Sequence, residues 1–342
     1  MALSVVLPVL DEARDIGRLL AEILGQTPPP GGFEVLVVDG GSSDGTPDIV
    51  RAAMRDHPEL RLIGNPRRLS SAGRNAGARA ARGEHVLFLD GHCALPRSDY
   101  LQRAIEIFAS TGAACLCRPQ PLIRLADGKW ARAISAARHS RLGHHPSSDI
   151  FGGSPGPRDP RSAGAAYTRA CLERLGGYDE RFDACEDVEF NCRVAAAGLP
   201  AYLHPDLAVE YRPRSSPGAL LRQMTRYGRG RARLMARHPR EVPWPLVLAT
   251  ALCLLLPAIL IGWGARAAGA VAAIVLGGWA LAAGVEGLRL GGLGAEAARV
   301  AVSLLVIPAG LLLGFWRGLL DAPRLRGPRR EGGLGQGDGG RP

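Results

Sequence analysis

The chain has 342 residues, 46% of them hydrophobic, and a formal net charge of +10. This length suffices for one large α/β domain with appendages or for two ordinary domains. Its seven cysteines lack the spacing of a zinc site, and its short, uncharged N-terminus is unlike a signal peptide. A zinc module is therefore excluded, and the soluble part is expected to stay in the cytosol with reduced thiols.

Strands alternate with helices in the first ninety residues. Apolar runs predict buried strands, and apolar residues at helical spacing predict helices. The strands are expected at 4–9, 34–38, 60–65 and 85–89, and the helices at 11–24, with Asp11 or Asp15 as its cap, 48–55 and 70–82. This alternation predicts a mostly parallel sheet with helices on both faces. Ligands bind at the carboxyl ends of such strands, so Asp39 and Asp90 should converge on one crevice.

The middle of the chain is less regular. Residues 151–162 are rich in Gly, Pro and Ser, which predicts a mobile loop. Further helices are expected at 170–175, 186–197 and 217–237.

The composition changes abruptly at residues 237–243. This predicts a cytosolic domain over 1–240, a membrane region over 241–320 and a disordered basic tail over 321–342. A basic belt precedes the apolar region and comprises Arg222, Arg226, Arg229, Arg231, Arg233, Arg237 and Arg240. Such a belt binds anionic lipids and marks the cytoplasmic side, so a membrane is the expected partner and nucleic acid is not.

The apolar runs cover 246–264, 267–285 and 300–316, which predicts two to three transmembrane or re-entrant helices. Only Ala265 and Arg266 separate the first two runs, which implies a tight hairpin. The third run is short, and three spans would place a basic tail outside, against the charge rule. Either this segment is re-entrant or lies in the interface, or the tail breaks the rule.

Two strand ends carry groups suited to a nucleotide and a metal. Asp39 could accept a hydrogen bond from a nucleobase, and the loop from Gly40 to Gly45 would allow close backbone approach. The alternative is an ordinary turn with Asp44 as a helix cap. Asp90 and His92 could hold Mg²⁺ or Mn²⁺ between two phosphates, or His92 could simply form a hydrogen bond in a turn.

Two helices carry further candidates. Asp187, with Glu186, could serve as the general base that takes a proton from an acceptor, although first-turn carboxylates also complement a helix dipole. Gln223, Arg226 and Tyr227 could contact a diphosphate and an acceptor, or belong only to the solvated basic face.

Taken in order, these segments resemble the family 2 glycosyltransferases of GT-A fold, from Ser4 to about Arg237. Four segments carry the resemblance: VVLPVLDE at 5–12, VVDGGSSDGT at 37–46, GRNAG at 73–77, and GGYDE at 176–180 followed by Glu186 and Asp187. The D-x-H motif and Tyr227 depart from the usual D-x-D and Q-x-x-R-W. Both departures resemble the subgroup typified by succinoglycan glucosyltransferases, as does YRPRSS at 211–216.

The resemblance implies an inverting transfer from a nucleoside-diphosphate sugar. It implies that Asp39 binds uracil, Asp90 and His92 the phosphates and metal, and that Asp187 is the base, with Glu186 beside it. Arg74, Gln223 and Arg226 would lie along the diphosphate or acceptor. The donor-binding residues expected on this basis are Pro8, Asp11, Glu12, Asp39, Gly41, Ser42, Asp44, Arg74, Asn75 and Asp90.

The expected function is transfer of a hexose, from UDP-glucose as first choice, to a polyprenyl-diphosphate-linked saccharide in exopolysaccharide or envelope glycan synthesis. The expected location is the cytoplasmic membrane, with other polysaccharide-assembly enzymes as further partners. Two alternatives remain: a polyprenyl-phosphate glycosyltransferase, and a non-catalytic membrane scaffold that retained the fold.

Overall fold

The computed structural model describes residues 1–122, 127–144, 148–161 and 163–321. The described residues form two compact units. The first comprises those of 1–122 and 147–212, and the second comprises those of 123–146 and 213–327. The boundary expected at residue 240, where the membrane region would begin, stays a prediction. Of the tail predicted over 321–342, Asp321 ends a helix and 322–342 lie outside the described residues.

The first unit contains an eight-stranded sheet with the order β3-β2-β1-β4-β8-β6-β9-β7. Strands β3 (Leu60–Gly64), β2 (Phe33–Asp39), β1 (Leu3–Val9) and β4 (His85–Phe88) are parallel, whereas β8 (Gly164–Thr168) runs antiparallel to both of its neighbours. This confirms the predicted mostly parallel α/β sheet. The other strands are β6 (Cys115–Cys117), β7 (Gly156–Pro157) and β9 (Ala201–Leu203), with β5 (Cys93–Ala94) and β10 (Glu210–Tyr211) paired in a separate ribbon.

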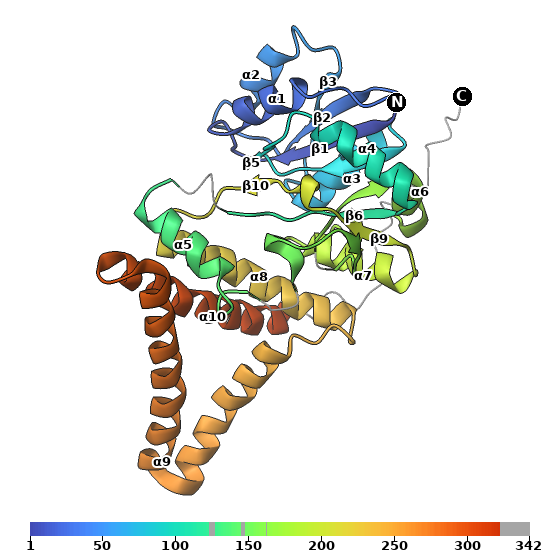
Figure 1. Ribbon diagram of the computed structural model, residues 1–342. Helices are drawn as coiled ribbons and strands as arrows, with labels where there is room; N and C mark the ends of the chain where they lie inside the picture. The colour runs from blue at the N-terminus through green and yellow to red at the C-terminus, as the bar shows by residue number, and fades with distance from the viewer. Residues whose placement is uncertain (123–126, 145–147, 162, 322–342) are drawn as a thin grey trace. The chain divides into compact units, whose positions relative to one another are not determined.

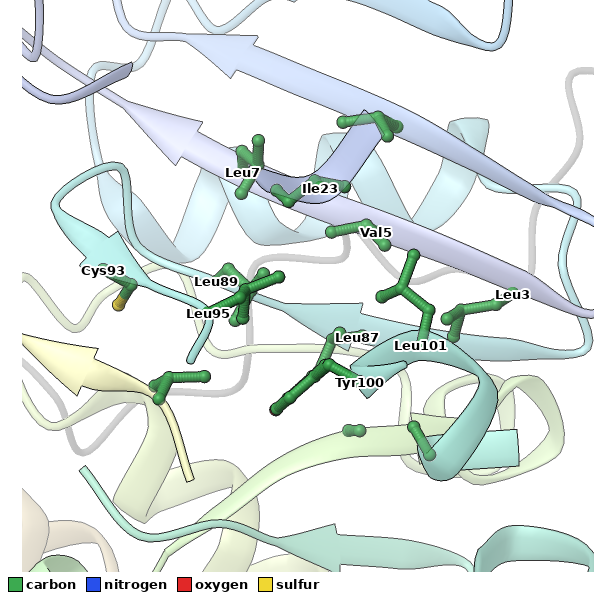
Figure 2. Close-up of a cluster of buried hydrophobic side chains, with 14 of the residues drawn as sticks. Leu3, Val5, Leu7, Ile23, Leu87, Leu89, Cys93, Leu95, Tyr100 and Leu101 are labelled. Carbon is green, nitrogen blue, oxygen red and sulfur yellow. The ribbon is translucent and has the colours of Figure 1, made fainter. Parts of the chain in front are cut away.

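Hydrophobic side chains fill both faces of this sheet. Along β1, Leu3, Val5 and Leu7 point into one core and Val6 into the other, as the two-residue period of a strand requires. Figure 2 shows the first core, where the β1 side chains meet Leu87 and Tyr100. The helices of this unit are α1 (Ile16–Leu24), α2 (Thr46–Ala53), α3 (Ser70–Ala80), α4 (Tyr100–Thr111), α6 (Arg169–Leu175) and α7 (Glu186–Ala196).

Two local predictions were wrong. The helix expected from residue 11 begins at Ile16, because Asp11 has a φ of 54° and the segment before Ile16 bonds to the loop after β2. Asp15 accepts hydrogen bonds from Arg212 instead of capping α1. The segment expected to be a loop over 151–162 is irregular for most of its described length and differs from the prediction only in the two-residue strand β7, which pairs with β9, and in Phe151, which ends a short 3₁₀ helix; Ser162 lies outside the described residues.

The second unit is helical and contains α5 (Lys129–His139), α8 (Pro217–Arg237), α9 (Trp244–Gly291) and α10 (Ala295–Asp321). Helix α9 breaks at Gly264, where φ is 83°, next to the predicted hairpin at Ala265 and Arg266. Figure 1 shows α9 as two straight arms that meet at this break. By length and composition, Ile259–Gly291 and Ala295–Asp321 can each cross a membrane, and Trp244–Leu255 is a shorter apolar stretch.

Helices α8 and α10 pack backbone against backbone. A Cβ on Gly314 would lie 1.9 Å from the Thr225 carbonyl oxygen, and one on Gly228 would lie 2.0 Å from that of Leu311. Gly310 and Gly318, one turn to either side of Gly314, meet α8 at similarly short distances. The glycines therefore set the separation of the two helices, and α10 is fixed along the basic helix α8.

Gly314→Ala should separate these helices and destabilise the second unit by about 1–3 kcal/mol, as overpacking of a tight interface does. Gly277→Ala is the matched control, because nothing lies within 4 Å of the Cβ that it adds. Thermal unfolding of the detergent-solubilised chain can be followed by tryptophan fluorescence, since all five tryptophans lie in segments of the second unit. Equal unfolding temperatures for the two variants would show that the glycine contacts do not determine the packing.

Candidate active site

The loop after β2 is built around the Asp39 carboxylate. One of its oxygens accepts from the Gly41 amide at 3.0 Å, and the other accepts from the Ser42 hydroxyl at 2.6 Å. Gly41 has a φ of 79°, which a glycine adopts without strain. Asp39 therefore shapes the loop that the sequence assigns to the nucleotide.

Asp44 and Asp11 join this loop to the segment after β1. The Asp44 carboxylate accepts from the Ala13 amide at 2.8 Å and from the Thr46 hydroxyl at 2.6 Å, and these hydrogen bonds, with that of Thr46 the largest, lower its pKa. Asp11 accepts from the Ser43 amide at 2.8 Å. Asp44 thus joins the turn before α2 to the segment after β1, whereas the N-cap of α2 is Gly45.

Arg74 connects two carboxylates at the centre of the site. Its Nη2 donates to Asp90 at 2.8 Å, and its Nε lies 3.6 Å from Glu186. The guanidinium lies 5.8 and 5.7 Å from the ring centroids of Phe88 and Tyr178, and only 11% of the side chain is exposed. Burial alone would lower the pKa of Arg74, but the nearby carboxylates, Asp90 first, raise it, so it stays charged.

The two acidic residues that start α7 have different surroundings. Glu186 is buried, whereas Asp187 is exposed and accepts only from the Val188 amide, at 2.8 Å, among the hydrogen bonds found in the described residues. Burial raises the pKa of Glu186, the Arg74 guanidinium opposes this rise, and the Asp187 charge adds to it. Glu186 is therefore placed to pair with Arg74, whereas the Asp187 carboxylate is exposed.

Asn75 and Pro8 make contacts that hold helix α3 in place. The Asn75 side chain donates to the Tyr178 carbonyl at 2.9 Å and accepts from the Tyr178 amide at 2.7 Å. Pro8 on β1 lies against Gly73 of α3, at 3.1 Å from where a Cβ would stand. Both contacts fix α3, and with it Arg74, against the sheet and the segment before α7.

His92 lies near Asp90 but faces a different carboxylate. Its Nδ1 is 2.8 Å from Glu12 Oε1, its ring packs edge-on against Tyr211, and its buried Nε2 has no hydrogen-bond partner in the described part of the chain. The described His, Cys, Asp and Glu residues include no group of three or more placed to hold a metal ion. The buried Nε2, which has no hydrogen-bond partner among the described residues, nevertheless fits a metal that takes its remaining ligands from other oxygens.

The predicted α8 residues belong to the second unit. Gln223 is buried and its side-chain amide donates to the Tyr227 hydroxyl at 3.3 Å, whereas Arg226 is exposed. Within the first unit Arg74 brings Asp90 and Glu186 together, and within the second Gln223 bonds to Tyr227.

Family models match most of the chain. The model for glycosyl transferase family 2 matches residues 4–163, and that for glycosyl transferase family group 2 matches residues 85–285. The chain is 30% identical to "Succinoglycan biosynthesis protein ExoA" of Rhizobium meliloti, over 94% of this chain and 96% of that protein. The chain belongs to glycosyltransferase family 2.

Two solved structures share the fold. The chain is similar to "Mannosyltransferase PcManGT from Pyrobaculum calidifontis in complex with GDP-Man and Mn2+", with a TM-score of 0.60, 23% identity and coverage of 92% of this chain and 87% of that one. It also resembles S. aureus TarS 1-349 in complex with UDP, with a TM-score of 0.50, 17% identity and coverage of 91% and 90%. At these identities the likeness confirms the GT-A type of fold.

Sequence reasoning missed three contacts that shape the site: Glu12 with His92, Asp15 with Arg212, and Asn75 with Tyr178. Each joins segments at least 80 residues apart. Residues so far apart in the chain form no local sequence pattern that would predict these contacts. The sequence shows only that the residues involved can form hydrogen bonds.

Glu186→Gln should change how stability depends on pH. The pKa of Glu186 is raised in the folded chain, so its contribution is full below the ordinary glutamate value and is lost as pH rises through the folded value. The unfolding temperature of the unmutated chain, relative to Glu186→Gln, should therefore fall as pH rises above the ordinary glutamate value of about 4.3. Thermal unfolding followed by circular dichroism measures both unfolding temperatures. If the unmutated chain instead became more stable relative to Glu186→Gln as pH rises, the raised pKa of Glu186 would be contradicted.

Proposed function

We propose that this family 2 glycosyltransferase transfers a hexose, with inversion, from a UDP-sugar to a polyprenyl-diphosphate-linked saccharide at the cytoplasmic membrane face. The similarity to a succinoglycan biosynthesis protein over nearly the full length of both chains carries this proposal. Complexes of TarS with UDP and UDP-GlcNAc support a uridine nucleotide, with UDP-glucose as the first donor to test.

In this proposal the donor lies along the carboxyl ends of β1, β2 and β4. Asp39 accepts from the uracil, and the Gly41–Ser42 backbone lies against the nucleotide. Pro8, Asp11, Asp44 and Asn75 hold the surrounding segments, through the contacts described above. Arg74 keeps Asp90 in place and contributes positive charge beside the diphosphate.

Asp187 is the general base of the proposed reaction. Its carboxylate takes the proton of an acceptor hydroxyl while that oxygen bonds to the anomeric carbon of the sugar. The bond from this carbon to the phosphate oxygen breaks, and its electron pair leaves with UDP. Attack from the face opposite the leaving group converts an α-linked donor into a β-linked product.

Asp90 and His92 would hold a divalent cation, Mg²⁺ or Mn²⁺. When bound, the cation would offset the negative charge that develops on the departing diphosphate. The mannosyltransferase structure of the same fold carries Mn²⁺ with GDP-Man, which supports testing Mn²⁺ first.

The second unit would bind the membrane and the lipid part of the acceptor. The arms of α9 expose large apolar side chains, among them Leu254, Ile261 and Trp263, which water would not favour. The third apolar run is then interfacial, because α10 packs along the basic helix α8. Arg226 is exposed on α8 and is the group proposed to meet the acceptor diphosphate, beside Gln223 and Tyr227.

Asp187→Asn should leave UDP affinity nearly unchanged and reduce transfer by roughly 10²–10⁴-fold, the usual range for a general base. Glu173→Gln is the matched control, because Glu173 is also an exposed carboxylate on a helix of the first unit. Transfer is measured in membranes that carry the full chain, and UDP affinity by calorimetry. Unchanged turnover in Asp187→Asn would remove this residue from the reaction.

Parallel assays with two acceptors separate the proposal from its nearest alternative. A polyprenyl-diphosphate-linked saccharide and a bare polyprenyl phosphate are each supplied with a panel of UDP-hexoses and Mn²⁺. Labelled sugar on the first acceptor alone supports the proposal, and label on the bare phosphate supports a lipid-phosphate glycosyltransferase. UDP binding without transfer to either acceptor would contradict both specificities.

A further inference from the structure

The segment after β1 and the D-G-H segment after β4 are joined by one side-chain contact. Glu12 Oε1 lies 2.8 Å from His92 Nδ1, although the residues are 80 positions apart. Both side chains are largely shielded from solvent, with 21% of Glu12 and 18% of His92 exposed. A contact of this length between a carboxylate and an imidazole is a charge-assisted hydrogen bond.

This hydrogen bond determines which imidazole nitrogen carries the proton. An ionised carboxylate only accepts hydrogen bonds, so the hydrogen must be on Nδ1. In the neutral ring Nε2 then keeps its lone pair. That nitrogen is buried and meets no hydrogen-bond partner within the described residues, so no protein donor occupies it.

The surrounding residues are shaped to permit this contact. A Cβ on Gly91 would lie 2.9 Å from Glu12 Cγ and 3.1 Å from a Val9 methyl carbon, so any other residue at 91 would displace the Glu12 side chain. Tyr211 holds the imidazole from a second direction, with its ring centroid 4.4 Å away and nearly perpendicular. The next residue, Arg212, is anchored by Asp15 at 2.8 Å.

We propose that Glu12 is a positioning residue that fixes His92 in the Nδ1–H form and presents Nε2 as a ligand for the divalent metal. The inference rests on the proposed metal-dependent transfer and changes the expected role of Glu12, which acts through His92 and not on the donor. A carboxylate behind a ligating histidine raises the basicity of the ligand and fixes its orientation. The proton position and the orientation of His92 therefore depend on Glu12, and also on Gly91, which leaves room for the Glu12 side chain.

The test is Mn²⁺ binding to the full chain in detergent with UDP, followed by electron paramagnetic resonance of free and bound Mn²⁺. His92→Ala should weaken Mn²⁺ binding and remove the nitrogen hyperfine coupling of the bound ion. Glu12→Ala should weaken binding by about 10–100-fold, the usual effect of losing a carboxylate behind a ligating histidine. Glu12→Gln, which keeps a hydrogen-bond acceptor without the charge, should lie between Glu12→Ala and the unmutated chain.

Two further variants test whether the effect is specific to the contact between Glu12 and His92. Gly91→Ala should weaken Mn²⁺ binding as Glu12→Ala does, because it displaces Glu12 without removing it. Glu59→Gln is the matched control, since Glu59 lies 3.2 Å from His57 in a second carboxylate–histidine pair of the first unit, and it should have no effect. Circular dichroism confirms that each variant is folded.

The outcomes separate the inference from the function on which it rests. If His92→Ala weakens Mn²⁺ binding and the Glu12 and Gly91 variants do not, His92 is a metal ligand but Glu12 does not position it. If His92→Ala leaves Mn²⁺ binding unchanged, His92 is no ligand and both proposals about it fail. Nitrogen-15 shifts of His92 provide an independent check, and an Nε2-bound proton in the metal-free chain would overturn the inference.

Discussion

The organisation of the active site depends on one buried guanidinium. Arg74 lies between Asp90, which follows β4, and Glu186, which begins α7, and it pairs with both. Without it, two carboxylates in a poorly solvated site would repel each other, and removing one partner of a buried ion pair costs about 3–5 kcal/mol. Asn75, one residue along α3, fixes the same helix to the segment before α7, so the position of Asp187 follows from these two contacts.

A division of roles follows among the acidic residues. Asp11, Asp39 and Asp44 hold the loops after β1 and β2 together through their hydrogen bonds, and Glu186 lies 3.6 Å from Arg74. Asp187 is exposed and accepts a single hydrogen bond among those of the described residues, which suits the general base proposed above. The second unit would then be responsible for the lipid, through the apolar arms of α9 and the glycine-packed pair of α8 and α10.

The sequence predicts this fold best where the preference of a segment for a strand agrees with its position in the sheet. The strands at β1, β2 and β4 are apolar on both faces and precede helices, so both their type and their order could be read. The strands β6, β7 and β8 could not, because two to five residues are too few to give a periodicity, and β7 and β8 also contain Gly with Ala or Pro. The site motifs were found by resemblance, but the contact of Glu12 with His92 and the burial of Glu186 depend on tertiary packing.

The most direct test of the account is calorimetric titration of the detergent-solubilised full chain with UDP and Mn²⁺, comparing the unmutated protein with Arg74→Lys. A single ammonium group cannot span Asp90 and Glu186 as the guanidinium does. The account predicts UDP binding by the unmutated chain and binding weakened by about tenfold or more in the variant, which corresponds to roughly 1.4 kcal/mol. Equal UDP affinity in the two folded proteins would contradict the claim that Arg74 organises the site.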